Sequence, residues 1–369
     1  MEGLGLDMFS NVYRNKKVLL TGHTGFKGSW LAMWLQELGA EVVGIALPPN
    51  TDPSHFDLLK LDFKSHFIDI RNYDEVLKAI KKAQPEIVFH LAAQPLVRDS
   101  YAMPLETLDT NVMGTANVLN ACRDIGTLKA VVVVTSDKCY KNKEWVWGYR
   151  ENDAMGGYDP YSASKGCAEL VTACFRNSYF NLSDFGSKHQ VLLASARAGN
   201  VIGGGDWSKD RLIPDIMRAI ASQKVVPIRN PDATRPWQHV LECLSGYLCL
   251  GEKLLQGDKK FAEAWNFAPS GNEMITVGEI VRKMQSCWAK IQYEIISDSK
   301  QPHEANLLKL DASKANAWLR WREVWNLEKT LDVVTNWYRG FYEGNDILTA
   351  GDIEKYIQDA RKLSIEWAN

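Results

Sequence analysis

Residues 17–30 read KVLLTGHTGFKGSW, an apolar run that passes through three glycines into a helical pattern. Gly22, Gly25 and Gly28 let the backbone come close to an anionic group, and the N-terminus of the following helix presents free N–H groups to it. A glycine triplet alone is a weak signal, but between a strand and a helix it stands where a dinucleotide pyrophosphate site requires it. The alternative is a tight structural turn.

Outward from this turn, strand and helix patterns alternate as far as residue 198. Apolar runs predict strands at residues 17–21, 41–47, 67–70, 87–92, 131–135 and 191–196. Helical patterns lie between them, at 29–38, 73–83, 111–121 and from Pro160 onward. The four valines and one threonine of 131–135 are typical of a strand buried on both faces. This alternation predicts an α/β fold, a doubly wound parallel sheet with helices on both faces.

The pattern changes after residue 198. Helical signals at 213–222 and 277–288 and short strand signals at 225–229 and 292–296 predict a smaller α/β lobe over the carboxyl edge of the sheet. We expect a dinucleotide-binding domain at 16–198 with a return segment at about 237–268, a substrate lobe at 199–236 and 269–345, and a helical tail at 346–369. Helical spacing of Trp318, Trp321 and Trp325 predicts that they form the core of the lobe.

Composition limits the function classes. The chain has 369 residues, of which 24% are charged, and a net charge of -2, which gives no electrostatic case for nucleic acid or an anionic membrane. No apolar run approaches the ~18 residues that span a bilayer, and the N-terminus lacks a signal-peptide core. The seven cysteines include no C-x-x-C and no zinc-spaced cluster, so we expect a reducing cytoplasm and no metal.

Tyr161 and Lys165 are four residues apart, so on a helix they share a face. A phenol with a pKa of about 10 is a poor base at neutral pH, and a nearby cation would lower that pKa. Asp137 follows the buried strand 131–135, at the carboxyl end where open α/β sheets place their sites. These residues predict acid–base chemistry beside the dinucleotide.

The second strand ends in Ala46-Leu47-Pro48 and lacks the acidic residue that normally grips the adenosine ribose. Asp52 is a substitute from the following loop, and no arginine there suits a 2′-phosphate. This region therefore leaves NAD and NADP open. Asp69 is either an acceptor for the adenine amine or a turn residue at the end of the third strand.

Several motifs resemble those of the extended short-chain dehydrogenase/reductases, and within them the nucleotide-sugar 4,6-dehydratases. In the family's order they are the glycine loop, Asp69-Ile70, HLAA at 90–93, NVMGT at 111–115, and Tyr161 with Lys165. The segments TSDKCY at 135–140 and RAGNVIGGGDW at 197–207 most resemble dehydratases that act on CDP-glucose. The resemblance covers roughly residues 16–345. Relatives acting on other nucleotide sugars carry glutamate at the position of Lys138.

The resemblance implies a Rossmann-type fold, NAD as cofactor and CDP-glucose as substrate. It also implies a cytoplasmic homodimer or homotetramer that supplies deoxysugars for surface polysaccharide such as O-antigen, with no nucleic-acid or membrane partner. The residues that would hold NAD are Gly22, Thr24, Gly25, Phe26, Lys27, Gly28, Asp69, Ile70, Leu91, Ala92, Ala93, Tyr161 and Lys165.

The implied reaction removes water from C5 and C6 of glucose after oxidation at C4, because a C4 ketone makes the C5 proton removable. Tyr161 would deprotonate the C4 hydroxyl, and Lys165 would lower the tyrosine pKa and hold the nicotinamide ribose. Ser136 would hydrogen-bond the C4 oxygen, and Asp137 would protonate the departing C6 hydroxyl. Lys138 has three possible roles: base at C5, electrostatic stabiliser of the C5 enolate, or ion-pair partner of Asp137.

Further residues would bind the nucleotide sugar. Arg235 and Asn200 match the family's phosphate-binding arginine and pyrophosphate-binding asparagine, with surface charge and turn residue as the alternatives. Arg211 and His303 lie where relatives contact phosphate and nucleotide. Gln94 is either a sugar contact or a structural amide.

Two other functions use parts of the same pattern. A nucleotide-sugar 4-epimerase shares the glycine loop, Tyr161 and Lys165 but needs no acid–base pair such as Asp137-Lys138. A silent NAD-binding regulator would have no need to keep these residues together. A dehydratase acting on a dTDP-, UDP- or GDP-linked sugar is the third alternative, because the base preference rests on resemblance.

Overall fold

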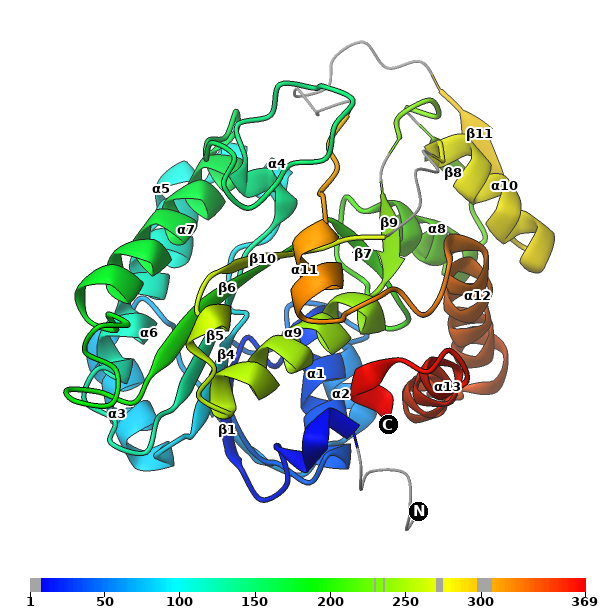
Figure 1. Cartoon of the computed structure of the whole chain (residues 1–369). Coiled ribbons are helices and arrows are strands. Elements are labelled where there is room, and N and C mark those ends of the chain that lie inside the picture. The colour runs from blue at the N-terminus through cyan, green and yellow to red at the C-terminus, as the bar shows by residue number, and fades with distance from the viewer. Residues whose placement is uncertain (1–7, 229, 235, 270–274, 297–306) are drawn as a thin grey trace.

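A seven-stranded parallel sheet forms the centre of the molecule in this computed structural model, which describes residues 8–228, 230–234, 236–269, 275–296 and 307–369 (Figure 1). The spatial order is β10-β6-β5-β4-β1-β2-β3, and every neighbouring pair is parallel. The strands are β1 (Lys17–Thr21), β2 (Glu41–Ala46), β3 (Lys64–Phe67), β4 (Ile87–His90), β5 (Ala130–Val134), β6 (Leu192–Ala198) and β10 (Ala264–Phe267).

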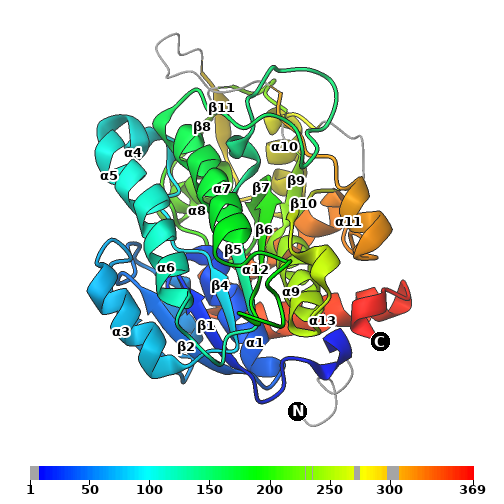
Figure 2. The ribbon, with the colours of Figure 1, turned by 60° about the vertical axis from the view of Figure 1, so that its left-hand side comes forward.

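Helices cover both faces of this sheet, as the alternation of patterns predicts. Alternate residues of β1 divide between two cores: Val18 and Leu20 pack with α1 (Phe26–Glu37) and α9 (Val240–Leu255), and Leu19 packs on the opposite side. That opposite side carries α3 (Tyr73–Ala83), α6 (Gly114–Cys122) and α7 (Pro160–Ser178), of which α6 and α7 stand in front of the sheet in Figure 2. The fold is the expected doubly wound α/β sheet.

The order in which strands are added to the sheet reverses between β1 and β4, because β2 and β3 extend the sheet on one side of β1 while β4, β5 and β6 extend it on the other. Open α/β sheets bind ligands outside the carboxyl ends of the strands at such a switch point. The glycine loop leaves β1 there, and α4 (Val97–Ala102) and α5 (Pro104–Leu108) follow β4 on the same edge. The topology therefore places the site before any side chain is considered.

Smaller elements lie over that edge (Figure 1). Two short parallel pairs form there, β7 (Asn200–Ile202) with β9 (Trp237–His239) and β8 (Val226–Ile228) with β11 (Tyr293–Ile295). The remaining helices are α2 (His55–Leu59), α8 (Leu212–Ala221), α10 (Val277–Cys287), α11 (Ser313–Trp318), α12 (Leu327–Gly344) and α13 (Thr349–Lys362). The division into domains stays a prediction, although β10 returns to pair with β6. Within the described ranges, no helix combines the length and apolarity needed to cross a membrane.

One expectation about local structure is wrong, and a second, the burial of the three tryptophans, is confirmed only in part. The third strand runs over 64–67 instead of 67–70, because the apolar residues Ile68 and Ile70 follow the strand in an extended turn, where Ile68 N still donates to Ala46 O. The tryptophans do not share a helix: α11 ends at Trp318, which is 57% exposed. Trp321 and Trp325 are buried in the following irregular segment, where Trp321 Nε1 donates to Ser245 Oγ of α9 at 2.9 Å.

Candidate active site

A cleft of about 1560 Å³ lies at the carboxyl edge of the sheet, between the glycine loop and the smaller elements. Apart from Asp52, every predicted site residue in the described part of the chain lies on its wall. These are Gly22, Thr24, Gly25, Phe26, Lys27, Gly28, Asp69, Ile70, Leu91, Ala92, Ala93, Gln94, Ser136, Asp137, Lys138, Tyr161, Lys165, Asn200 and Arg211. Arg235 and His303 lie outside the described residues.

Two of the loop glycines are required by the fold itself. A Cβ on Gly22, whose φ is +76°, would stand 2.7 Å from Ala92 N, and one on Gly28 would stand 2.0 Å from Gly22 O. The turn, the start of α1 and the end of β4 therefore pack too closely for any side chain. This arrangement brings Ala92 against the glycine loop.

Gly25 differs from the other two glycines. A Cβ there would meet only Gly22 O, at 3.4 Å, so the protein itself leaves room for a side chain. Gly25 caps α1 without a side-chain hydrogen bond, and the first turn holds Lys27 and no acidic residue. A cation at a helix N-terminus is unfavourable unless an anion lies there. Open space, uncapped N–H groups and Lys27 together fit a dinucleotide pyrophosphate.

The adenosine end has a different set of polar groups from the one that the sequence suggests. Asn50 and Thr51 are on the cleft wall, whereas Asp52 is not among the described residues that line it. Asp69 is held by Arg71, whose Nη2 donates to Oδ2 at 2.6 Å, and this bond lowers the pKa of the carboxyl. Asp69 thus remains an ionised acceptor at the cleft wall, already engaged by an arginine.

Ser136 organises the turn that follows β5. Its hydroxyl donates to Asp137 Oδ1 at 2.8 Å and accepts from Lys138 N at 3.2 Å, which caps the short 3₁₀ turn Asp137–Cys139. The Asp137 carboxylate reaches Gly199, where a Cβ would stand 3.2 Å from Oδ2. Glycine at 199 therefore lets the carboxylate lie close to the turn that leads to Asn200.

Tyr161 lies in the first turn of α7, beside Ser136. Pro160 opens the helix, and Asp159 caps it by accepting from Ser162 N. Burial raises the pKa of Tyr161 to about 12; the hydrogen bond with Ser136 and the charge of Arg211 act in the opposite direction. The pKa of Tyr161 therefore lies above its ordinary value and not below it as predicted, because desolvation of the phenolate outweighs the groups that favour its charge.

Lys165 is buried one turn further along α7. Burial, together with the charge of Lys27, lowers the pKa of Lys165 to about 8, and Glu169 acts in the opposite direction. Below pH 8 the folded protein therefore carries a desolvated ammonium group. In the unfolded chain the same group is hydrated, so its burial lowers the stability of the fold.

Replacing Lys165 by methionine is expected to stabilise the folded protein near neutral pH. The shift in the lysine pKa corresponds to up to about 3 kcal/mol in the free energy of unfolding. The gain in stability should be full below pH 8. It should disappear as the pH rises toward the pKa of an ordinary lysine, because the lysine of the folded protein is then neutral. Urea unfolding at pH 7 and pH 10 measures it; equal stability of both proteins at pH 7 would contradict the expectation.

Gln94 is a structural amide in this structure. Its side chain donates to Leu96 O at 3.1 Å and Thr107 Oγ1 at 2.9 Å, and it accepts from Leu96 N at 2.5 Å. Asn111 clamps the backbone of the same residue, because its side chain accepts from Gln94 N and donates to Gln94 O. The loop after β4 is thus held in place by two amide side chains whose N–H groups each donate two hydrogen bonds within the protein.

In this structure Arg211 forms an ion pair within the protein and not the phosphate contact that the resemblance implies. Its Nη1 donates to Asp206 Oδ2 at 3.0 Å, and its charge reaches Tyr161. Asn200 begins β7, which pairs with β9, so its position depends on the smaller elements. Binding of phosphate by Asn200 and Arg211 stays a prediction.

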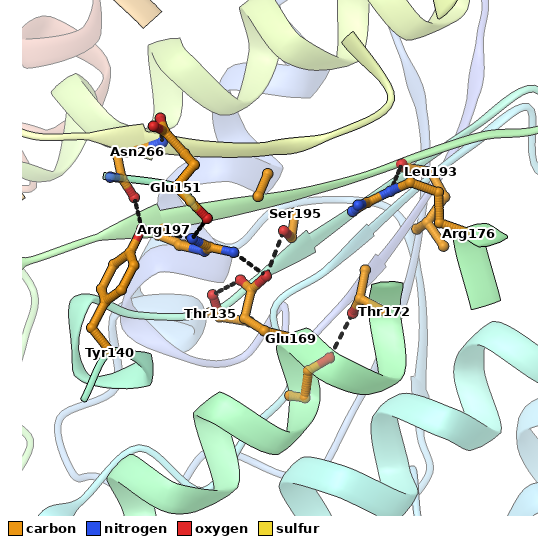
Figure 3. Close-up of polar contacts among 12 residues, drawn as sticks. Thr135, Tyr140, Glu151, Glu169, Thr172, Arg176, Leu193, Ser195, Arg197 and Asn266 are labelled. Atoms are coloured by element: carbon orange, nitrogen blue, oxygen red, sulfur yellow. Dashed lines mark hydrogen bonds and ion pairs between the residues drawn. The ribbon is translucent and has the colours of Figure 1, made fainter. Parts of the chain in front are cut away.

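One buried cluster beside the site was not predicted from the sequence (Figure 3). Glu169 of α7 pairs with Arg197 of β6, Nη2 to Oε2, at 2.8 Å, and both side chains are 4% exposed. Glu169 follows Lys165 by four residues, so the helical spacing could have identified it. The pairing with Arg197, 28 positions away in sequence, has no local signal.

Comparisons with known proteins agree with this geometry. The model of the family described as GDP-mannose 4,6 dehydratase matches residues 19–333. A protein of Salmonella typhimurium strain LT2 named CDP-glucose 4,6-dehydratase is 53% identical over 92% of this chain and 94% of its own length.

Two solved structures show the same fold. An epimerase from Methanothermobacter thermautotrophicus has a TM-score of 0.79 at 24% identity, covering 92% of this chain and 96% of its own. UDP-glucuronic acid 4-epimerase from Bacillus cereus, in complex with UDP-glucuronic acid and NAD, has a TM-score of 0.74 at 22% identity, covering 88% of this chain and 99% of its own. The chain therefore belongs to the GDP-mannose 4,6 dehydratase family, within the extended short-chain dehydrogenases/reductases.

Proposed function

We propose that this protein is an NAD-dependent dehydratase that converts CDP-D-glucose to CDP-4-keto-6-deoxy-D-glucose and water. The observation that carries the proposal is the Ser136-Asp137-Lys138 turn beside Tyr161, on the wall of the cleft that also holds the glycine loop. The cytidine diphosphate is supported by the 53% identity to the Salmonella enzyme of that name.

The residues present fit NAD at the glycine loop. When bound, NAD supplies the acceptor that oxidises C4 of the sugar and later restores hydrogen at C6. The N–H groups at the start of α1 and Lys27 would hold the pyrophosphate, and Lys165 would hold the nicotinamide ribose. The NAD named in the Bacillus cereus complex supports this cofactor.

The chain's own groups divide the proton transfers. Tyr161 takes the proton of the C4 hydroxyl, and Ser136, which bridges Tyr161 and Asp137, hydrogen-bonds the same oxygen. Asp137 gives a proton to the departing C6 hydroxyl from its place at the end of β5. Burial of these side chains keeps bulk water from the 4-keto sugar.

The direct test is incubation with CDP-glucose and NAD. Nuclear magnetic resonance should show a 4-keto-6-deoxy sugar, whereas a 4-epimerase would return a hexose with every hydroxyl retained. A competition assay that contains CDP-, dTDP-, UDP- and GDP-linked hexoses in one reaction would test the preference for the nucleotide base. Faster turnover of another nucleotide would overturn CDP-glucose as the substrate and leave the dehydratase chemistry intact.

Lys138 is proposed to assist removal of the C5 proton, directly or through a water. Lys138→Met is expected to lower product formation by roughly 10²-fold and to reduce deuterium incorporation at C5 in heavy water equally. Lys141→Met is the control, since Lys141 lines the same cleft outside the turn. Full incorporation of deuterium at C5 by Lys138→Met would exclude the lysine as the base.

A homodimer is proposed through α5 and α7, which pack side by side on one face (Figure 2). Exposed apolar side chains gather there, with Leu105 80% and Leu170 59% exposed. The double change of Leu105 and Leu170 to glutamate is expected to give a monomer in sedimentation velocity, because buried charge at an interface is unfavourable. Leu363→Glu, at an exposed leucine after α13, is the control; an unchanged sedimentation coefficient in the double variant would contradict the interface.

The reducing cytoplasm is the proposed location. All seven cysteines are free thiols, and burial raises the pKa of Cys122 to about 12, which keeps that thiol unreactive.

A further inference from the structure

Three ionisable side chains follow one another along the buried face of α7. Tyr161, Lys165 and Glu169 are spaced by four residues, and all three are buried. The spacing places them in one row that faces the carboxyl half of the sheet. Only the first two have a role in the proposed reaction, so the third needs a reason for its burial.

Glu169 holds the segment that leads into the catalytic turn. Its Oε1 accepts from Thr135 Oγ1 at 2.5 Å, and its Oε2 accepts from Ser195 Oγ at 2.7 Å and Arg197 Nη2 at 2.8 Å. Thr135 immediately precedes Ser136. One carboxylate therefore links α7 to the ends of β5 and β6 (Figure 3).

Arg197 holds the other flank of the same turn. Its Nη1 donates to Tyr140 Oη at 2.6 Å and to Glu151 O at 3.0 Å, and Tyr140 Oη donates onward to Asn266 Oδ1 at 2.8 Å. Tyr140 immediately follows the turn Asp137–Cys139. The two members of one buried ion pair thus form hydrogen bonds with Thr135 and Tyr140, which flank the turn that holds Ser136, Asp137 and Lys138.

Stability alone does not account for the pair. Desolvation of two charges offsets most of their attraction, and apolar side chains of similar volume stabilise a core equally well or better. The pair also acts on the charge of the site: Glu169 favours the Lys165 cation, whereas Lys27 of α1 opposes it, and Cys139 of the turn and His90 of β4 also interact with this lysine. Glu169 is thus the carboxylate that favours the lysine cation.

We propose that Glu169 and Arg197 are a positioning pair for the dehydration, which aligns the Ser136–Lys138 turn with Tyr161 and gives Lys165 its opposing charge. The inference rests on the proposed function for its substrate. It assigns neither residue a contact with substrate or cofactor; both act through the residues that they hold.

Glu169→Gln tests the pair, because glutamine keeps the size of the side chain and removes its charge. We expect kcat for CDP-glucose to fall by roughly 10- to 100-fold with little change in KM, since small displacements of catalytic groups cost this much. The alkaline limb of the pH–rate profile should move to lower pH, because Lys165 loses the charge that favours its cation. A purely structural role would leave that limb in place.

Two further variants separate positioning from folding. Glu252→Gln is the matched control, since Glu252 is also 4% exposed and accepts from Ser10 Oγ at 2.6 Å in the last turn of α9; it should lower stability without moving the pH profile. The double variant Glu169→Gln with Arg197→Met removes both charges. Full recovery of kcat and of the alkaline limb in the double variant would overturn the proposal; persistence of both defects supports it.

A measurement on the protein without substrate keeps the inference independent of the reaction. The ¹³Cε signal of Lys165 in lysine-labelled protein, assigned with Lys165→Met, reports its titration directly. Its midpoint should lie at lower pH in Glu169→Gln than in the natural protein, and an unchanged midpoint would overturn the electrostatic part. If the natural protein fails to turn over CDP-glucose, the proposed function fails while this titration still decides the role of Glu169.

Discussion

Replacing Tyr161 by phenylalanine is expected to lower kcat for CDP-glucose dehydration by roughly 10³-fold. The change removes the phenol oxygen alone, at a side chain that is 8% exposed and already packed on the sheet, so the fold should be retained. Without that oxygen the C4 hydroxyl loses its proposed proton acceptor, and Asp137, the buried carboxyl group beside Ser136, is proposed to serve the C6 hydroxyl instead. The loss should appear equally in product formation and in deuterium incorporation at C5, because both follow oxidation at C4.

The raised pKa of Tyr161 gives this prediction a pH dependence. Since burial holds the pKa near 12, the phenolate fraction increases as the pH rises through the neutral range, and the natural enzyme should gain rate until Lys165 loses its proton near pH 8. The residual activity of Tyr161→Phe should lack the rise. Tyr101→Phe, at an exposed tyrosine of α4, is the control, and a Tyr161→Phe enzyme with undiminished water loss would refute the proposed chemistry.

Most of the sheet could be predicted from the sequence because its central strands β1, β4, β5 and β6 are largely buried on both faces. The run 131–135 illustrates this, since β5 is buried throughout its length over Ala130–Val134. The predicted position of the third strand is too far along the chain, because Ile68 and Ile70 continue the apolar pattern beyond the residues that pair with β2. Local hydrophobicity indicates which residues are buried, but it does not indicate which backbone groups form hydrogen bonds with a neighbouring strand.

The tryptophans show the corresponding limit for helices. Spacing predicts a shared helix for Trp318, Trp321 and Trp325, but Arg320 adopts φ +55° and ends it. Trp325 N donates to Glu242 Oε1 of α9, a contact made 83 residues away in sequence. Tertiary contacts of this kind override helical periodicity and leave no local signal.

For the site, the sequence identifies the contiguous motifs and fails where the environment decides. Glycine loop, catalytic turn and helix pair are each short segments, and the topology brings them to one cleft. The direction of the pKa shift of Tyr161 depends on burial by distant elements, and the brace between Glu169 and Arg197 joins α7 to β6. Spacing along one chain contains neither burial nor partners from another strand.

Asp137→Asn is expected to lower formation of the 4-keto-6-deoxy product by roughly 10²- to 10⁴-fold, the contribution of a positioned general acid. Asparagine has the same shape and can still accept the hydrogen bond from Ser136 Oγ, which is 2.8 Å long in the natural protein. It has no acidic proton for the departing C6 hydroxyl. Because Asp137 is 4% exposed, bulk water is poorly placed to replace it.

The effect should divide the reaction in a way that Tyr161→Phe does not. Oxidation at C4 and removal of the C5 proton precede departure of the C6 hydroxyl, so CDP-glucose recovered from heavy water should still carry deuterium at C5. Asp99→Asn is the control, since Asp99 lies on the cleft wall in an ion pair with Lys209. If deuterium incorporation fell as far as product formation, Asp137 would act before the elimination, and the proposed division between the turn's carboxylate and the tyrosine would be wrong.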